Sequence, residues 1–209
     1  MSAIVLGAGP GLGLALGQAY AATGRKVVLV ARTEDQVQQV AAQVGPDAIG
    51  LAADLSKPAE VERVVRRAAD EAGTPDIVHY NASVMAEGSP STVALADVES
   101  CWRVSCLGAW AALQASVPML DPGSAFFVTG GGLALDPWPP ASALASAKAA
   151  VRNLVFAAAK ELPDLKIAMI TINGVIAEGT ELSPDEIARW FLSLLEESSP
   201  AVETVLPRA

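Results

Sequence analysis

The sequence predicts an α/β fold, in which a parallel, doubly wound sheet of six or seven strands carries helices on both faces. Short apolar runs alternate with helical patterns almost to the last residue. Strands separated by helices need crossover connections, which make the sheet parallel and cover both of its faces. With 209 residues, 52% of them hydrophobic, the chain can bury one core and is short for two. We therefore expect a single domain over residues 1–209.

In the first half of the chain, the expected strands end near residues that suit turns and helix starts. Thr33 and Gln36 match the T-x-x-Q capping box of a helix. Ser56 is expected to cap the helix that follows the third strand, and Gly73 to end it. The strands are expected at 3–6, 27–31, 48–52 and 77–81, and the helix that Ser56 caps at 58–72.

The second half continues the alternation. Ser183 begins the last helix, with Pro184 at its first position and Glu186 completing a capping box. The periodicity before it predicts one long or interrupted helix over 93–119 and an alanine-rich helix over 142–162. The strands of this half are expected at 125–129 and 166–172, with a possible seventh at 202–206.

Composition argues against several classes of function. The net charge of −9 has the wrong sign for binding a phosphate backbone, so we expect no nucleic-acid partner. No signal-peptide pattern or long apolar run is present, so we expect no membrane association and a cytoplasmic location. Cys101, Cys106 and the single histidine, His79, assemble neither a disulfide framework nor a zinc site. Both cysteines are expected to be buried, and no metal is expected.

A glycine-rich turn, Gly7-Ala8-Gly9-Pro10-Gly11-Leu12-Gly13, follows the first strand and leads into the first helix. Glycine lets the backbone turn tightly beside a ligand, and the helix start offers unpaired N–H groups to a phosphate. The turn therefore predicts a nucleotide pyrophosphate ligand. Its spacing is G-x-x-x-G-x-G, because Leu12 and Leu14 stand where the G-x-G-x-x-G fingerprint has its third glycine. A helix start behind a flexible loop, with no ligand, is the alternative.

Arg32 follows the second strand, at the place that faces the adenosine ribose in a doubly wound fold. A carboxylate there would accept a hydrogen bond from the 2′-hydroxyl of NAD, whereas the fork of an arginine suits the 2′-phosphate of NADP. With Ala31 before it and Thr33 after it, the position has no carboxylate. NADP(H) is the predicted cofactor, and an arginine solvated on a loop is the alternative.

Five short motifs in order resemble those of the short-chain dehydrogenase/reductase family, over nearly the whole chain. They are the turn with Gly7, Gly11 and Gly13; Asp54-Leu55, similar to the pair that contacts adenine; Tyr80-Asn81-Ala82-Ser83, where the family has Asn-Asn-Ala-Gly; Lys148-Ala149-Ala150; and Thr180, similar to the threonine that ends the cofactor segment. The resemblance implies a Rossmann domain with strand order 3-2-1-4-5-6-7. The cofactor-binding residues it implies are Gly7, Gly9, Pro10, Gly11, Leu12, Gly13, Arg32, Thr33, Asp54, Leu55, Asn81, Ala82, Ser83, Lys148, Gly174, Val175, Ile176 and Thr180.

The catalytic part of the family's pattern is mostly missing. In the family, a Tyr-x-x-x-Lys pair supplies the proton and holds the nicotinamide ribose, and a serine polarises the substrate carbonyl. Here Lys148 is kept, but Leu144 stands at the tyrosine position and Gly131 at the serine position. Ser105 stands where the family has its asparagine, and Gly174-Val175 where it has Pro-Gly. Lys148 is thus the one usual catalytic residue that remains.

Other side chains could take over part of the lost chemistry. Tyr80 ends the fourth strand, where ligands bind in such folds, and Tyr20 lies on the first helix; a structural role is the favoured interpretation of Tyr80 and of His79. Trp138 is either a wall of the substrate site or a loop-packing residue. The remaining polar candidates are Asp136, Ser83, Ser105, Ser142 and Ser146.

These residues support an NADP(H)-dependent oxidoreductase that transfers a hydride to or from a small organic substrate by a non-standard proton route. A catalytically silent NADP-binding or sensor protein is the alternative, and an interaction module with a vestigial pocket is a third. The resemblance also implies a homodimer or homotetramer through the fourth and fifth crossover helices, where Cys101, Trp102, Trp110 and the stretch 141–159 offer close-packing surface.

Overall fold

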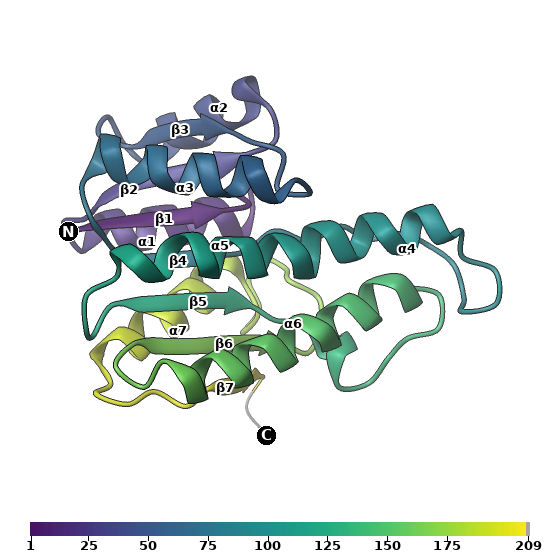
Figure 1. The fold of residues 1–209 in the computed structure, drawn as a ribbon. Helices are drawn as coiled ribbons and strands as arrows, with labels where there is room; N and C mark the ends of the chain where they lie inside the picture. The colour runs from purple at the N-terminus through teal and green to yellow at the C-terminus, as the bar shows by residue number, and fades with distance from the viewer. Residues whose placement is uncertain (208–209) are drawn as a thin grey trace.

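Seven parallel strands form one sheet in the order β3-β2-β1-β4-β5-β6-β7, which confirms the predicted fold class. The computed structural model describes residues 1–207 (Figure 1). The seventh strand, left open by the sequence, is present. The strands are β1 (Ser2–Leu6), β2 (Lys26–Ala31), β3 (Ile49–Ala52), β4 (Pro75–Tyr80), β5 (Ala125–Thr129), β6 (Lys166–Ile172) and β7 (Glu203–Leu206).

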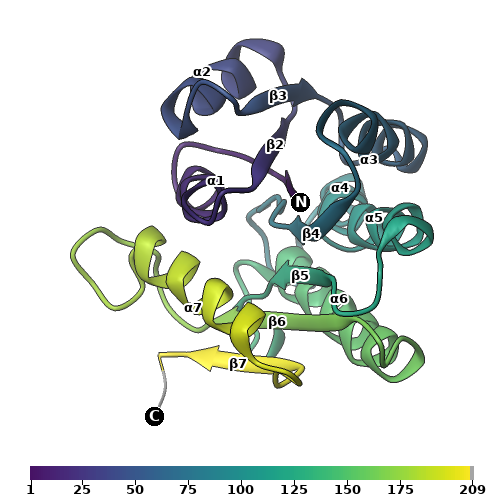
Figure 2. The same cartoon turned by 90° about the vertical axis from the view of Figure 1, so that its left-hand side faces the viewer.

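Helices cover both faces of the sheet, so its strands are buried on both sides. Figure 2 shows α1, α2 and α7 on one face and α3, α4, α5 and α6 on the other. Ala3 and Val5 of β1 pack into the first layer, while Ile4 and Leu6 pack into the second. The helices are α1 (Leu12–Ala22), α2 (Glu34–Val44), α3 (Pro58–Ala72), α4 (Leu95–Trp102), α5 (Gly108–Ser116), α6 (Ser142–Glu161) and α7 (Pro184–Glu196). Among the described residues, no helix is long and apolar enough to cross a membrane.

The helical region expected over 93–119 is interrupted, because a π-helical segment, η1 (Arg103–Leu107), separates α4 from α5. The buried hydroxyl of Tyr80 donates a hydrogen bond to the carbonyl of Val104 in this segment, at 2.5 Å. Gly108 packs tightly behind it: a Cβ there would lie 2.2 Å from the Tyr80 hydroxyl oxygen and 2.5 Å from the carbonyl oxygen of Leu55. A short 3₁₀ helix, η2 (Val117–Met119), ends the region.

Gly73 ends α3 as predicted, and one of the three predicted N-terminal caps is confirmed. The backbone N–H of Glu186 donates to the Ser183 hydroxyl oxygen, at 3.4 Å, at the start of α7. The Glu186 carboxylate does not complete the predicted capping box, because it pairs with Arg189 while the Ser183 N–H donates to the carbonyl of Thr180. Thr33 stands at the cap of α2 but makes no capping hydrogen bond, so the predicted capping box is wrong. The cap predicted at Ser56 is also wrong: Lys57 is the cap residue of α3, and the Ser56 hydroxyl donates instead to the Asp54 carboxylate, at 2.7 Å. The turn after β3 uses this serine before the helix begins.

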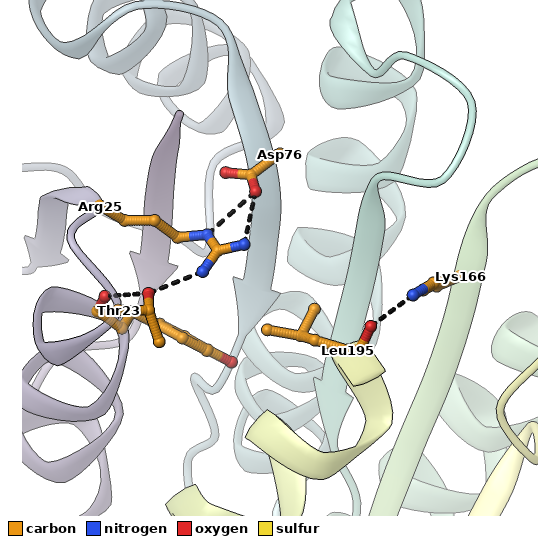
Figure 3. A network of polar contacts seen from close by, with 6 residues as sticks. Thr23, Arg25, Asp76, Lys166 and Leu195 are labelled. Carbon is orange, nitrogen blue, oxygen red and sulfur yellow. Dashed lines mark hydrogen bonds and ion pairs between the residues drawn. The ribbon is translucent and has the colours of Figure 1, made fainter. Parts of the chain in front are cut away.

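Polar contacts tie helices to strands at the amino ends of the strands, away from the ligand-binding edge expected of the fold (Figure 3). Arg25 donates through Nε and Nη2 to one oxygen of Asp76 at the start of β4, at 2.9 and 2.7 Å, and through Nη1 to Thr23 after α1. Lys166, which begins β6, donates to the carbonyl of Leu195 near the end of α7, at 2.5 Å. These contacts anchor α1 and α7 and leave the carboxyl ends of the strands for a site.

Candidate functional site

Two cavities open at the carboxyl ends of the strands and meet at Asn81 and Ser83, which line both. The first cavity has a volume of about 310 Å³ and is lined by Gly7, Ala8, Gly9, Ala31, Arg32, Gln36, Ala53, Asp54, Leu55, Ala82, Val84 and Val104 besides the shared pair. The second has a volume of about 500 Å³ and is lined by Leu12, Thr129, Gly130, Gly131, Gly132, Leu133, Asp136, Leu144, Lys148, Ile172, Asn173, Gly174 and Ile176. They flank the point where strand order reverses between β1 and β4, the usual ligand crevice of such sheets.

The glycine turn has two crowded glycines and two open ones. Gly7 has a φ of +99°, and a Cβ there would lie 2.5 Å from the backbone N of Ala82. A Cβ on Gly13 would lie 2.7 Å from the Cα of Ala8, so both positions require glycine. A Cβ on Gly9 would have its nearest neighbour at 4.0 Å, and one on Gly11 would have none within that distance. The open side adjoins the amino end of α1, which leaves room for an anionic group there.

Arg32 and Asp54 lie at the first cavity's far end. Among residues 1–207, no hydrogen bond or ion pair engages the exposed guanidinium of Arg32, so its donors are available to a ligand. Asp54 is held in place: its carboxylate accepts from the N–H and the hydroxyl of Ser56, at 3.0 and 2.7 Å. The Ser56 hydroxyl lowers the pKa of Asp54, with a further contribution from Lys57. This end of the cleft therefore presents a fixed carboxylate acceptor and a free arginine fork.

Lys148 lies buried at the other end of the cleft. Its ammonium donates to the main-chain carbonyl of Thr129, at 2.9 Å, and burial lowers its pKa from 10.5 to about 8. The two positions that the family fills with polar groups lie beside it. Leu144 is one helical turn before Lys148 on α6, and a Cβ on Gly131 would lie 3.7 Å from the lysine Cε. The fold thus brings together the corner in which the resemblance places the catalytic residues, with a leucine and a glycine where the tyrosine and serine would be.

Lys148→Met is expected to stabilise the ligand-free protein by roughly 1–3 kcal/mol at pH 7. The folded-state pKa of about 8 lies below the ordinary 10.5, so burying the charged ammonium costs the most stability below pH 8. That cost shrinks as pH rises from 8 to 10.5, because the unfolded chain then binds the extra proton. Denaturant unfolding of both proteins at pH 7 and pH 10 measures the difference, which should narrow at pH 10. Lys160→Met, at an exposed position on the same helix, is the control and should change stability little.

The other polar candidates differ in whether their side chains are free. Ser83 lines both cavities, and its hydroxyl has no hydrogen bond within the described part of the chain. Ser142 donates to the carbonyl of Gly88, and Ser146 accepts from the Trp102 indole, at 2.9 Å, so neither hydroxyl is free. Asp136 lines the second cavity. Ser83 and Asp136 are therefore the polar side chains best placed to meet a substrate.

Several residues predicted for the site line neither cavity. Ser105 is buried in η1, where its hydroxyl accepts from the backbone N–H of Val84 at 3.4 Å. Trp138 is exposed on its loop. The predicted cofactor-binding residues outside the cavities are Pro10, Gly11, Gly13, Thr33, Val175 and Thr180. Gly11 and Gly13 still shape the turn; the contacts of the others with a cofactor stay predictions.

Some lining residues were missed by the sequence reasoning. Thr129 ends β5 and Asn173 follows β6, so their place at the carboxyl ends of strands was a signal that could have found them. Gln36 lines the first cavity from the first turn of α2, and Arg32 lies just before that helix. The sequence marked Gln36 only as part of a capping box, and the packing of α2 beside the glycine turn brings it to the cleft.

Tyr80 is not placed to replace the missing proton donor, because its hydroxyl is buried, lines neither cavity and bonds Val104. Tyr80→Phe should lower the free energy of unfolding by about 1–3 kcal/mol, since the Val104 carbonyl loses its partner. It should leave cofactor binding unchanged. Unfolding by denaturant and fluorescence titration with NADPH measure the two effects. Loss of turnover without loss of binding in any reaction the wild type performs would restore Tyr80 as a catalytic candidate.

Comparison with known proteins finds relatives over nearly the whole chain. The family model described as short chain dehydrogenase matches residues 1–187. Versicolorin reductase stcU of Emericella nidulans is 28% identical over 207 residues, covering 97% of this chain and 75% of that protein. An uncharacterized oxidoreductase of Staphylococcus aureus (strain MRSA252) is 29% identical over 209 residues, covering 93% of this chain and 90% of its own.

Solved structures show the same fold. An alcohol dehydrogenase from Thermococcus sibiricus complexed with 5-hydroxy-NADP superposes with a TM-score of 0.89 at 25% identity, covering 99% of this chain and 96% of that one. A short chain dehydrogenase from Burkholderia cenocepacia in complex with NADP has a TM-score of 0.88 at 23% identity, covering 98% and 94%. Because the family model spans well over half of the sequence, this chain belongs to the short-chain dehydrogenase family.

Proposed function

We propose that this protein is an NADP(H)-dependent oxidoreductase that transfers a hydride between NADP(H) and a small organic substrate, with a proton route that does not use the family's tyrosine. The observation that carries the proposal is the cleft of two joined cavities, with the free guanidinium of Arg32 at one end and the ammonium of Lys148 at the other. The Thermococcus sibiricus alcohol dehydrogenase, complexed with 5-hydroxy-NADP, gives further support.

The residues fit the cofactor in both halves of the cleft. The open glycines and the amino end of α1 would hold the pyrophosphate, Arg32 the 2′-phosphate, and Asp54 the adenine. Lys148 would leave the Thr129 carbonyl for the nicotinamide ribose. When bound, the cofactor supplies or accepts the hydride.

The substrate must be one that needs little help from an acid. With Leu144 and Gly131 in the corner, the chain lacks the tyrosine and the serine that the family uses there to protonate and polarise a ketone. An iminium, a quinone or an activated alkene is already electrophilic, so positioning supplies most of the acceleration. Ser83 and Asp136 would orient such a substrate at the mouth of the second cavity.

Thermal shift and NADPH oxidation test the proposal together. NADPH should raise the melting temperature more than NADH at equal concentration, as expected when a ligand binds the folded state. A panel of carbonyl, imine and quinone acceptors should then include one that causes a loss of NADPH absorbance. Binding of NADPH with no acceptor-dependent oxidation argues against an enzyme, and no stabilisation by NADP(H) would favour the interaction module.

A catalytically silent NADP-binding or sensor protein is the second candidate, and the apolar Leu144 and Gly131 favour it. Lys148→Ala separates the two. A sensor should lose only cofactor affinity, whereas an enzyme should also lose turnover at saturating cofactor.

We also propose that the protein is cytoplasmic and assembles as a homodimer or homotetramer through α4, α5 and α6. Trp102 and Trp110 are 42% and 47% exposed, so neither ring is buried against the sheet within one subunit. Large exposed aromatic rings are typical of surfaces that another subunit covers. Sedimentation equilibrium should give a dimer or tetramer mass, and a monomer at micromolar concentration would contradict the assembly.

A further inference from the structure

A chain of hydrogen bonds runs through the interior from α1 to the glycine turn. The Tyr20 hydroxyl bonds Nδ1 of His79, at 2.8 Å, and His79 Nε2 bonds the Thr129 hydroxyl oxygen, at 2.9 Å. The Thr129 hydroxyl bonds Oδ1 of Asn81, and Nδ2 of Asn81 bonds the carbonyl of Gly7, both at 2.8 Å. Its last side chain, Asn81, stands where the two cavities meet.

The chain of bonds permits only one direction of donation. A carbonyl only accepts, so the Asn81 amide turns its nitrogen to Gly7 and its oxygen to Thr129. Thr129 then gives its single hydroxyl proton to Asn81 and must accept from His79 Nε2, which carries a hydrogen. Burial lowers the pKa of His79 to about 3, so the neutral ring accepts at Nδ1 from the Tyr20 hydroxyl. One tautomer of His79 satisfies every link.

Packing alone does not account for these polar groups. His79 is fully buried among aromatic rings, with its ring centroid 4.2 Å from that of Phe191, where an apolar side chain would fill the space without needing partners. Thr129 also reaches the other end of the cleft, because its carbonyl accepts from Lys148. Thr129 therefore links Asn81 to Lys148 by hydrogen bonds, and both residues line the second cavity.

We propose that Tyr20, His79 and Thr129 are positioning residues of the cofactor cleft, which hold the Asn81 amide in the one orientation that ties the glycine turn to the end of β4. The expected effect on cofactor affinity rests on the proposed function. The hydrogen-bond arrangement of the side chains does not depend on it.

The first test reads the tautomer directly. His79 is the only histidine in the chain, so its ¹⁵N ring signals need no assignment among histidines. In the wild-type protein without cofactor, we expect the Nε2–H tautomer, unchanged from pH 5 to pH 8. An Nδ1–H tautomer, or a ring that titrates in this range, would overturn the inference whether or not the protein binds NADPH.

The second test removes the link at Thr129. Thr129→Val keeps the size and the main-chain carbonyl but loses the hydroxyl, and should weaken NADPH binding about tenfold. Thr129→Ser restores the hydroxyl and should bring binding back to near the wild-type value. Thr171→Val is the matched control, because Thr171 is also buried in a central strand and its hydroxyl donates to Glu203, at 2.6 Å, outside both cavities. It should bind NADPH as the wild type does.

Two outcomes would overturn the inference here: wild-type affinity in Thr129→Val, or equal losses in Thr129→Val and Thr171→Val. If Thr129→Val does not fold, Thr129→Ala, which introduces no new atoms, takes its place. If the wild type itself binds no NADPH, the proposed function fails. The NMR signals of the Asn81 side-chain amide then test the positioning role on their own. These signals should shift in Thr129→Val and stay in Thr171→Val; unchanged Asn81 signals in Thr129→Val contradict the positioning role.

Discussion

Arg32→Ala is expected to weaken NADPH binding by about 10- to 100-fold while NADH binding changes little. The guanidinium borders the first cavity with no partner among residues 1–207, so the 2′-phosphate of NADPH would take its charge-assisted hydrogen bonds. A hydrogen bond to a charged group contributes about 1.5–3 kcal/mol, which corresponds to that range. Fluorescence titration with both nucleotides measures the ratio of affinities.

Arg66→Ala is the matched control for Arg32→Ala. Arg66 is an exposed arginine on α3, paired with Glu62 and remote from both cavities of the cleft. Its loss should leave both affinities unchanged. An unchanged preference for NADPH in Arg32→Ala would show that the arginine is only a solvated loop residue.

Leu144→Tyr combined with Gly131→Ser should increase ketone reduction by about 10²- to 10⁴-fold, the usual contribution of a positioned general acid. That gain corresponds to roughly 3–5 kcal/mol of barrier. Leu144 lies one turn from Lys148, whose ammonium would lower the pKa of a tyrosine placed there. The three atoms nearest to a Cβ on Gly131 belong to the Lys148 side chain, at ordinary contact distances of 3.7 to 3.9 Å, so serine fits. NADPH oxidation with a panel of ketones measures the gain.

The control for the double variant is Leu144→Phe with Gly131→Ala, which adds similar bulk without hydroxyls. It should bind NADPH but reduce ketones no faster than the wild type. Equal rates in the two double variants, at equal NADPH affinity, would mean that the corner around Lys148 does not face the reacting carbonyl.

The predictions for Arg32 and Leu144 test NADPH binding and ketone reduction separately. The cofactor half of the cleft keeps a free arginine, a held carboxylate and an uncrowded helix start. The other half keeps a buried lysine, with a leucine and a glycine where its polar partners would stand. An enzyme with this site would depend on the electrophilicity of its substrate, whereas a sensor would need no substrate.

Periodicity predicted the strands and the layers, because a strand buried on both faces is apolar at every position and the helices between such strands force parallel pairing. Hydrogen bonds in turns were harder to predict. Ser56 looked like a cap, yet its hydroxyl donates to the carboxylate of Asp54, two residues earlier. Ser183 also has a carboxylate two residues earlier, at Glu181, but its hydroxyl oxygen accepts from the N–H of Glu186 and caps the helix. The local sequence shows which hydrogen-bond partners are possible, and the three-dimensional geometry determines which of these bonds form.

By itself, the sequence determined the fold class, the glycine turn, the lack of a carboxylate beside Arg32 and the apolar residues at positions 131 and 144. Each of these depends on residue type and spacing along the chain. Only the tertiary structure decided that Tyr80 bonds Val104, that the Ser83 hydroxyl has no partner among residues 1–207, and that His79 joins Tyr20 to Thr129. These contacts join residues that are 24 to 59 positions apart, and the packing of strands and helices sets which of them meet.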